Sequence, residues 1–363
     1  QRQSGMENPK NPYRISDYFA VDPEYGADEV LRSFVSTAHK LKLLVLLDLV
    51  YFHCGPAARC LEEHPDFVKR DENGNPVNGR WHFPQLNFDN PELREYLWSN
   101  MEYFLREFDI DGYRCDVSGA VPLDFWEEGR RRMERWKAAP LLLAESESAP
   151  TADQKSAFDA NYSFAFSFLL NDILKGEKTA EEFWTMWEEH PLYREPGLCF
   201  LRCFDNHDIA SDNYDARPER NGRNAMVDAA LAVLFTMNGV PFLYNGQEVA
   251  DGRRHSLFSN RFTGKNLVVD WARGLTPAGE GRMRLIRELV ELRRGSHALQ
   301  SGEVVKVDNS TPKQVLSYLR RTSEETLLVA VNLSDAPAET KFSAPGAGEQ
   351  AALPSGGWIV RPL

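Results

Sequence analysis

The sequence predicts an α/β fold of the barrel type, in which buried parallel strands alternate with amphipathic helices. Short runs rich in Leu, Val and Ile are typical of strands buried on both faces of a parallel sheet. Asp116, Glu145 and Asp208 each stand at the C-terminal end of such a run. A fourth run carries Asp48 and His53 towards its C-terminal end. An α/β barrel builds its active site at this end of its strands. The three equivalent carboxylates therefore predict acid, base and nucleophile chemistry.

The first half of the chain predicts strands and helices in alternation. Apolar residues at helical spacing mark the helices, and Asn90-Pro91 is a typical helix start because Pro suits the first helical position. Gly, Pro and Asn cluster between residues 54 and 87, which predicts a long loop or a small inserted subdomain. In order, the expected elements are a helix over 27–40, a strand ending at Asp48, a helix from Asn90 to Phe108, a strand ending at Asp116, a helix over 123–137 and a strand ending at Glu145.

The second half continues this pattern as far as residue 299 and then changes. Short alternating strands separated by Pro, Gly and Ser follow, which is typical of an antiparallel β domain. We expect a catalytic barrel domain over 1–299, with the inserted stretch at 54–87, and a C-terminal β-sandwich over 300–363. The expected elements are a strand over 158–164, a helix in TAEEFWTMWEEH, a strand through Asp205, a helix over 224–238, a strand in GVPFLYNGQE, a helix in RMRLIRELVELRR and strands in QVLSYLRR, TLLVAVNLS and GWIVRPL.

Composition excludes some classes of partner. The chain has 363 residues, and its 54 acidic and 42 basic side chains give a net charge of −12. This charge argues against a nucleic-acid partner and fits a neutral substrate. No apolar stretch is long enough to span a bilayer, and no signal peptide is visible, so a soluble protein of unknown localisation is expected. The five cysteines lack metal-ligand spacing and are interpreted as structural thiols.

Four motifs in fixed order carry a family resemblance. DLVYFH, GYRCD, LLLAE and FDNHD resemble the signature regions of the α-amylase superfamily, glycoside hydrolase family 13, and GVPFLYNGQE is similar to the end of its last barrel strand. The match runs from about residue 11 to 299, and the tail resembles the family's C-terminal β domain. The resemblance implies a (β/α)8 TIM-type barrel followed by an antiparallel β domain.

The resemblance also implies roles for the carboxylates. Retaining glycoside hydrolases use two carboxyl groups ~5–5.5 Å apart, one as nucleophile and one as acid and base. Carried over to this sequence, Asp116 is the nucleophile, Glu145 is the general acid and base, and Asp208 stabilises the transition state. Arg114, two residues before Asp116 on the same strand, holds that carboxylate ionised and in position. The alternative for Arg114 is a plain structural ion pair.

Further residues are expected to contact the sugar or to support those that do. The resemblance places Tyr13 as an aromatic platform beneath the reacting sugar, and His53 and His207 as binders of sugar hydroxyls. Asp48 is interpreted as structural, and Glu147 is the alternative to Glu145 as the acid.

Two loop features stay open or depart from the family. Trp81, His82 and Phe83 can line distant subsites or form a subdomain core. The family often has Asn where Phe52 stands, as a calcium ligand, and Lys-His after the nucleophile, where this chain has residues 117–120. Phe52 has no side-chain oxygen to offer calcium, so we expect no metal and no cofactor there.

The number of strands also departs from the pattern. Six barrel-type strands are recognisable, whereas the family's barrel has eight. An open barrel exposes two unpaired apolar edges. We expect a missing N-terminal segment to complete the barrel, so that this chain is part of a longer polypeptide or is joined by another segment.

The predicted function is that of a retaining glycoside hydrolase that cleaves α-glucosidic bonds, α-1,4 bonds in particular, in starch-like glucans or maltooligosaccharides. A transglycosylase or α-glucosidase of the same family is the alternative within enzymes. A catalytically inactive amylase-like binding protein is the alternative of another class. Because such relatives typically lose these carboxylates and all three are present here, an active enzyme is favoured.

Overall fold

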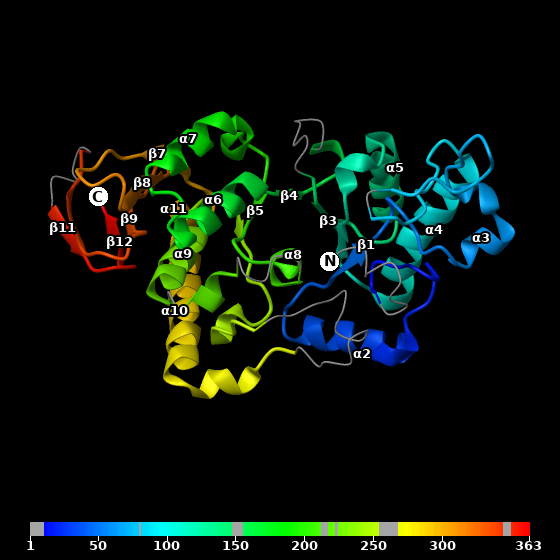
Figure 1. Cartoon of the computed structure of the whole chain (residues 1–363), viewed down its shortest axis with the longest axis horizontal. Coiled ribbons are helices and arrows are strands. Elements are labelled where there is room, and N and C mark those ends of the chain that lie inside the picture. Colours follow the sequence, from blue (N-terminus) through cyan, green and yellow to red (C-terminus); the bar gives the residue numbers. More distant parts are fainter. Residues whose placement is uncertain are drawn as a thin grey trace. The chain divides into compact units, whose positions relative to one another are not determined.

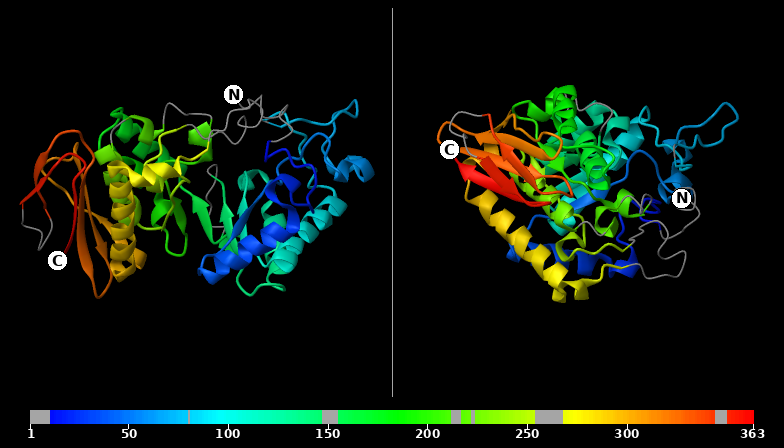
Figure 2. Two further views of the ribbon diagram at one scale, coloured as in Figure 1. Left: turned by 90° about the horizontal axis from the view of Figure 1, so that it is seen from below. Right: turned by 60° about the vertical axis from the view of Figure 1, so that its left-hand side comes forward.

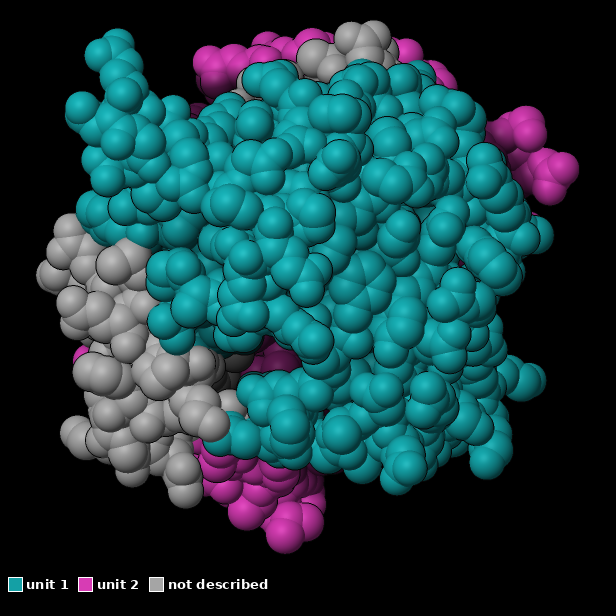
Figure 3. Space-filling view, turned by 90° about the vertical axis from the view of Figure 1, so that its right-hand side faces the viewer, with its two compact units in different colours: residues 1–162, 261–263 teal, residues 163–260, 264–363 magenta. Residues whose placement is uncertain are grey.

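The computed structural model describes residues 11–79, 81–146, 155–211, 217–221, 224–253, 268–343 and 350–363. The chain forms two compact units, residues 1–162 with 261–263 and residues 163–260 with 264–363 (Figure 3). Helices and strands alternate along both units up to residue 301, and antiparallel strands follow (Figure 1).

The first unit contains four parallel strands with helices between them. Its strands are β1 (Leu46–Leu49), β2 (Gly112–Cys115), β3 (Leu141–Ala144) and β4 (Ala160–Tyr162), paired in that order. Its helices are α2 (Ala27–Lys40), α3 (Cys60–Glu63), α4 (Pro91–Phe108) and α5 (Leu123–Met133), with short 3-10 turns at Pro23–Tyr25, Pro65–Phe67 and Ser118–Ala120. The stretch 54–87 holds α3, a 3-10 turn and isolated antiparallel bridges.

The core of the first unit lies between its strands and helices. Tyr113, Cys115, Leu142 and Ala144 point from β2 and β3 into one apolar cluster with residues of α2, α4 and α5. Since successive residues of a strand face opposite sides, Arg114 points away from this cluster. The helices thus cover one face of the strands, and Arg114 lies on the other face together with Leu143, its partner in register on β3.

The first strand departs from the sequence prediction. The run LKLLVLLDLVYFH forms only the short strand β1, so Asp48 lies within the strand and not at its end. Leu43, Leu44 and Leu46 are 57%, 63% and 36% exposed, so burial on both faces was wrong for this run. The physical reason is that β1 pairs only with β2 among the described strands.

The second unit adds two parallel strands, a helical layer and the antiparallel strands. Its parallel strands are β5 (Phe200–Arg202) and β6 (Val240–Pro241), which pair with each other. Its α-helices are α6 (Phe164–Lys175), α7 (Glu182–Glu189), α8 (His207–Ser211), α9 (Asn224–Thr236), α10 (Pro277–Arg294) and α11 (His297–Ser301). Short 3-10 turns lie at Pro191–Arg194, Pro218–Asn221, Gln247–Val249 and Trp271–Leu275.

Two antiparallel sheets follow α11. One sheet has the order β12-β9-β8-β7 and the other pairs β10 with β11. Apolar residues of β8 and β9 on one face join the core formed by α9, α10 and α11. Figure 2 shows this sheet beside α10. Residues on the other face share a second cluster with β10 and β11. The strands are β7 (Glu303–Lys306), β8 (Val315–Arg321), β9 (Thr326–Asn332), β10 (Ala338–Lys341), β11 (Gln350–Leu353) and β12 (Trp358–Pro362).

All five cysteines are free thiols, and Cys199 alone is not fully buried. Within the described ranges, no helix has the length and apolar character needed to cross a membrane.

Candidate active site

The carboxyl ends of β2 and β3 bring Asp116 and Glu145 to the same edge of the sheet. Arg114 pairs in register with Leu143, and Cys115 with Ala144, so the residue that follows each strand occupies an equivalent position. Aligned residues of parallel strands face the same side. The side chains of Arg114, Asp116 and Glu145 therefore converge, as the sequence predicted for strand ends.

Arg114 is the centre of this cluster. Its Nη1 lies 2.6 Å from Asp116 Oδ1 and 2.8 Å from Asp48 Oδ1, and its Nη2 lies 2.6 Å from Glu145 Oε1. The contact with Glu145 is an ion pair without hydrogen-bond geometry. The guanidinium side chain is only 10% exposed. One buried cation thus contacts three carboxylates.

The excess of negative charge acts on Asp116. Burial raises the pKa of the Asp116 carboxyl well above its ordinary value; the charge of Arg114 opposes this, and Glu145 and Asp48 add to it. Asp116 therefore holds a proton more readily than an ordinary aspartate. The guanidinium is the group that favours the ionised form, which a nucleophile requires.

Glu145 is held at both of its carboxylate oxygens. The backbone N–H of Val117 donates to Oε2 at 3.0 Å, while Arg114 contacts Oε1. Val117 reaches this position with a left-handed backbone, at φ 45° and ψ 38°. This conformation is strained for a β-branched residue. The turn after the strand thus orients the carboxylate through a main-chain donor.

Tyr13 is brought to the same cluster by the irregular stretch before α2. Its hydroxyl donates to Asp48 Oδ2 at 3.0 Å, and the backbone N–H of Tyr13 is bonded to Asn11 Oδ1. Burial, followed by the Asp48 charge, raises the pKa of the Tyr13 hydroxyl well above its ordinary value. The phenol is therefore a neutral donor. Asp48 lies between Tyr13 and Arg114, in keeping with its interpretation as a residue that orients its neighbours.

His53 is packed among aromatic rings. It is 3% exposed and stacks on Phe83 with ring centroids 4.6 Å apart, and Trp81 lies 5.9 Å away. Burial lowers the pKa of His53 to about 4, so the imidazole is neutral at neutral pH. Phe83 is itself buried, which fits a packing role, whereas His82 is exposed.

Phe52 stands where the family often has a calcium ligand. Its ring packs edge-on against His53 and Trp81, with centroids 6.2 and 6.0 Å away. A phenyl ring offers no oxygen to a cation, so this position does not fit calcium. Over the ranges that the structure describes, no group of three or more His, Cys, Asp or Glu side chains is arranged to hold a metal. The expected absence of calcium stays a prediction.

Tyr162 is a member of the cluster that the sequence reasoning did not single out. Arg114 Nε lies 3.4 Å from its hydroxyl, and the guanidinium carbon lies 5.6 Å from its ring centroid. Tyr162 ends β4 just as Asp116 and Glu145 follow β2 and β3. The strand-end position was the signal that could have found it.

Three predicted residues lie outside this cluster or outside the described ranges. Glu147, the alternative acid, lies in the part that is not described.

His207 and Asp208 belong to the second unit, where they begin the helix α8. Their placement directly after a strand was wrong: β5 ends at Arg202, and Asn206 Oδ1 caps the helix by accepting from the Ile209 N–H at 2.9 Å. The Asp208 side chain is 32% exposed, and its Oδ1 lies 3.9 Å from His207 Nε2.

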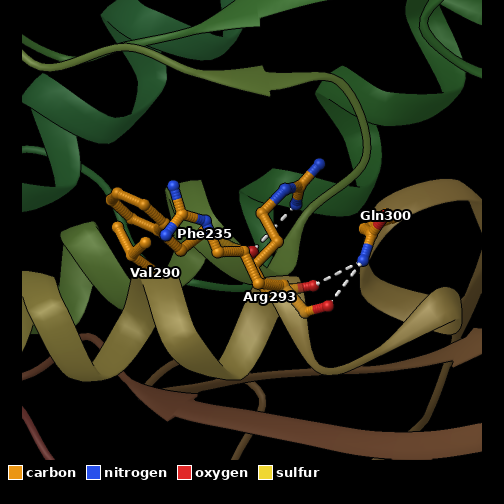
Figure 4. Close-up of a pocket in the computed structure, with 5 residues that line it drawn as sticks. Phe235, Val290, Arg293 and Gln300 are labelled. Atoms are coloured by element: carbon orange, nitrogen blue, oxygen red, sulfur yellow. Dashed lines mark hydrogen bonds between the residues drawn. The ribbon is translucent and has the colours of Figure 1, made fainter. Parts of the chain in front are cut away.

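A cavity of about 420 Å³ in the second unit lacks the carboxylates of the Arg114 cluster (Figure 4). Arg293 donates hydrogen bonds to the backbone carbonyls of Phe235, Met237 and Gly239. Gln300 donates to the carbonyls of Arg293 and Arg294. No carboxylate is among its lining residues, which are Phe235, Val290, Arg293, Arg294 and Gln300. The cluster around Arg114 is therefore the candidate active site.

Parallel strands that carry acidic residues at their carboxyl ends define an α/β barrel-type protein with carboxylate chemistry. The family model for the α-amylase catalytic domain matches residues 4–73 and 78–263, so the chain belongs to the α-amylase family.

Individual relatives agree with this family. A cyclomaltodextrinase from a Bacillus species is 27% identical over 349 residues, covering 88% of this chain and 59% of the relative. An α-amylase from Dictyoglomus thermophilum is 24% identical, covering 89% of this chain and 58% of the relative. The crystal structure of a maltogenic α-amylase from Thermotoga neapolitana superposes with a TM-score of 0.81 at 26% identity, covering 97% of this chain and 83% of that one. The chain thus spans less than two thirds of the length of the cyclomaltodextrinase and of the Dictyoglomus α-amylase.

Proposed function

We propose that this chain carries the catalytic centre of a retaining glycoside hydrolase that cleaves α-glucosidic, α-1,4 bonds in starch-like glucans or maltooligosaccharides. The observation that carries the proposal is the joint contact of Asp116 and Glu145 with the single guanidinium of Arg114, at 2.6 Å each. A link through one guanidinium favours the short carboxylate spacing of retaining enzymes over the ~6.5–9.5 Å of inverting ones.

The roles follow from the chemistry of each side chain. Asp116 attacks the anomeric carbon and forms a glycosyl-enzyme, while Glu145 gives its proton to the leaving oxygen. Glu145 then takes a proton from the water that releases the sugar. Arg114 favours the ionised nucleophile and keeps both carboxylates in place. Asp208 stabilises the positive charge that develops on the sugar ring in the transition state.

The remaining site residues bind the sugar. The ring of Tyr13 forms a platform for an apolar sugar face, and its hydroxyl is fixed by Asp48. His53 is neutral because burial lowers its pKa, so it can donate to or accept from a hydroxyl without adding charge. His207 makes a similar contact from the start of α8.

The product pattern from maltoheptaose tests the activity. Shorter maltooligosaccharides are expected; glucose alone would indicate the α-glucosidase alternative, and longer chains the transglycosylase. Because several relatives are named cyclomaltodextrinases, a cyclic maltooligosaccharide belongs in the same assay. An inactive binding protein would give no product with any of these substrates. Glu145→Gln is expected to abolish product formation, whereas Asp308→Asn, at a carboxylate that is 76% exposed, serves as the control.

We also propose that a further polypeptide segment covers the exposed apolar side of the first unit and completes the barrel. Val30 and Phe34 on α2 are 52% and 60% exposed, and Leu43 and Leu44 beside β1 are similarly open. Exposed apolar residues favour association, and so does the free edge of β1, which pairs only with β2 among the described strands. On this view the catalytic domain spans 1–299 with an insertion at 54–87, and a β-sandwich spans 300–363.

The covering segment is tested by intact mass, N-terminal sequencing and light scattering on the purified active species. The proposal expects the active species to contain residues beyond 1–363, or an additional chain. The variant Phe34→Glu of the isolated 1–363 chain is expected to bind less of a hydrophobic dye than the unmodified chain. An active, soluble monomer that consists of residues 1–363 alone would contradict the proposal.

A further inference from the structure

The buried arginine Arg217 links two segments of the second unit, one of which carries Asp208. β5 ends at Arg202, and the chain then runs through Asp205 to α8. Asp205 and Arg217 are both 0% exposed, and Arg217 Nε donates to Asp205 Oδ2 at 3.0 Å. Two charged groups so deeply buried require each other, because either alone in the interior is costly.

The start of α8 is set by the residues next to this ion pair. Asn206 Oδ1 accepts from the Ile209 N–H, and the Asn206 carbonyl accepts from the Ala210 N–H at 2.9 Å. Asn206 therefore caps the helix. Since Asp205 precedes it directly, the position of Asp205 determines where the helix with Asp208 begins.

The other contacts of Arg217 belong to the segment after β6. Its Nη1 donates to the backbone carbonyl of Arg253, and its guanidinium carbon lies 5.6 Å from the ring centroid of Tyr244. Arg253 is in turn bonded to Asp251, which is fully buried. Arg217 thus fixes Asp205 against a second segment of the same unit.

We propose that Arg217 is a positioning residue for Asp208, acting through Asp205 and the cap of α8. The inference rests on the proposed role of Asp208 in stabilising the transition state. A planar guanidinium with donors in fixed directions can hold a carboxylate, a carbonyl and a ring at once, which the single ammonium of Lys cannot. A small displacement of a group that stabilises developing charge lowers kcat more than it changes substrate binding.

Burial and two neighbouring charges act on the pKa of Asp205. Burial raises the pKa of Asp205 to about 7, although the charge of Arg217 lowers it. Glu219, another buried carboxyl near Arg217, raises it further. Without Arg217, Asp205 would be a buried carboxyl with no cation to hold it in place.

The variant Arg217→Lys, combined with Asp208→Asn, tests the inference. We expect Arg217→Lys alone to lower kcat on maltoheptaose by roughly 10- to 100-fold, with KM changed less than about threefold. In the Asp208→Asn background the same substitution is expected to change kcat by less than about twofold, because the group that it positions is already lost. Assays are run well below the melting temperature of each variant, so that unfolding does not enter the rates.

Arg320→Lys is the matched control. Arg320 is as deeply buried and donates to the carbonyls of Thr236 and Gly302, with no bond to the segment that carries Asp208. It is expected to lower the melting temperature and to leave kcat unchanged in both backgrounds. If Arg217→Lys does not fold, Asp205→Asn removes the other end of the pair and is expected to lower kcat in the same way.

Two results would overturn the inference. One is an unchanged kcat in folded Arg217→Lys. The other is an equal loss of kcat in both backgrounds, which would mean that Arg217 acts on something other than Asp208. Full activity of Asp208→Asn alone would be a separate failure, because it would remove the proposed role of Asp208 and this inference with it.

Discussion

Asp111 and Asp116 lie at opposite ends of β2 and are equally buried, each with 6% of its surface exposed. Asp111 is surrounded by donors: Lys137 Nζ at 2.9 Å, His39 Nε2 at 2.8 Å and the Val45 N–H at 2.8 Å. Asp116 shares one guanidinium with two other carboxylates. The same residue type at the same burial therefore meets opposite surroundings.

The two surroundings shift the pKa values in opposite directions. Burial tends to raise the pKa of Asp111, but the bonds from Lys137, Val45 and His39 outweigh it, and the pKa is lowered. The pKa of Asp116 is raised, because burial and two further carboxylates outweigh one arginine. The comparison teaches that burial alone does not mark a functional carboxylate. A functional carboxylate is marked instead by too few positive charges around it, as at Asp116. Asp116 also follows the carboxyl end of β2, where barrel enzymes place their catalytic residues.

Loss of the Asp116 carboxylate should abolish most of the activity, whereas loss of the Asp111 carboxylate should not. Asp116→Asn is expected to lower kcat by roughly 10³-fold or more, since an amide cannot act as the nucleophile. Its stability should be unchanged or higher, because a charge leaves a crowded site. Initial rates on maltoheptaose and urea unfolding measure both quantities. A variant within fivefold of the unmodified rate would contradict the role of Asp116.

Arg114→Lys is expected to lower kcat by roughly 10²-fold. Lysine keeps the charge, but its single nitrogen cannot reproduce the guanidinium, which contacts Asp48 and Asp116 through Nη1 and Glu145 through Nη2. Circular dichroism confirms folding, and Lys137→Arg, which keeps a cation beside Asp111, is the control at the other end of the strand. If Arg114→Lys kept full activity, the positive charge at this position would be sufficient for catalysis, and the contacts of the guanidinium would not be required.

Asp111→Asn is expected to affect stability and not activity. The amide weakens the bonds to Lys137 and His39, which should lower the free energy of unfolding by about 2 kcal/mol. The kcat on maltoheptaose should stay within about twofold of that of the unmodified chain. A large loss of kcat in a variant that is still folded would show that the two ends of β2 are not functionally distinct.

The pH dependence of stability should have opposite signs at the two ends. The folded pKa of Asp111 is below the unfolded value, so its contribution is present above about pH 4–5 and is lost as the pH falls through the folded pKa. The folded pKa of Asp116 is above the unfolded value, so stability is highest below about pH 4 and is lost as the pH rises toward the folded pKa. Urea unfolding from pH 3.5 to 7, with Asp111→Asn and Asp116→Asn as references, measures this. Slopes of equal sign would refute the comparison.

The smallest expected effect concerns the turn after Asp116. Val117→Gly relieves a left-handed backbone and should raise the free energy of unfolding by about 0.5–1 kcal/mol, after the greater freedom of glycine in the unfolded chain is counted. The N–H that holds Glu145 is retained, so kcat should change less than about threefold. Loss of stability would show that the strain assigned to Val117 is absent.

Most helices and strands were predictable where local signals were strong. The helices α2 and α4 have the predicted bounds, because periodic apolar residues and the Asn90-Pro91 start define them. The helix α6 was missed because it is buried on several faces, by Phe166, Leu169, Leu170 and Ile173 among others, and therefore shows no polar face to mark its period. The bounds of β1, β5 and β6 were too long, since an apolar run does not state how many of its residues find a partner strand.

The part of the candidate site that lies at the ends of strands could be predicted from the sequence. Arg114, Asp116 and Glu145 follow from position alone, because parallel strands bring their carboxyl ends to one edge. The threefold use of Arg114 and the left-handed turn at Val117 depend on side-chain distances and backbone angles that no pattern contains. The sequence predicted a strand end at Asn206, His207 and Asp208. The structure has a helix start there, which the capping ability of Asn206 favours.

In the proposed mechanism, Asp116 forms a covalent bond with the sugar while Glu145 transfers the proton. The most direct test of this mechanism is trapping with a fluorinated glycosyl fluoride, followed by mass spectrometry of the digested protein. We expect one added sugar on the peptide that contains Asp116, and no label at that peptide in Asp116→Asn. A label on Glu145, or turnover without any trapped intermediate, would contradict it.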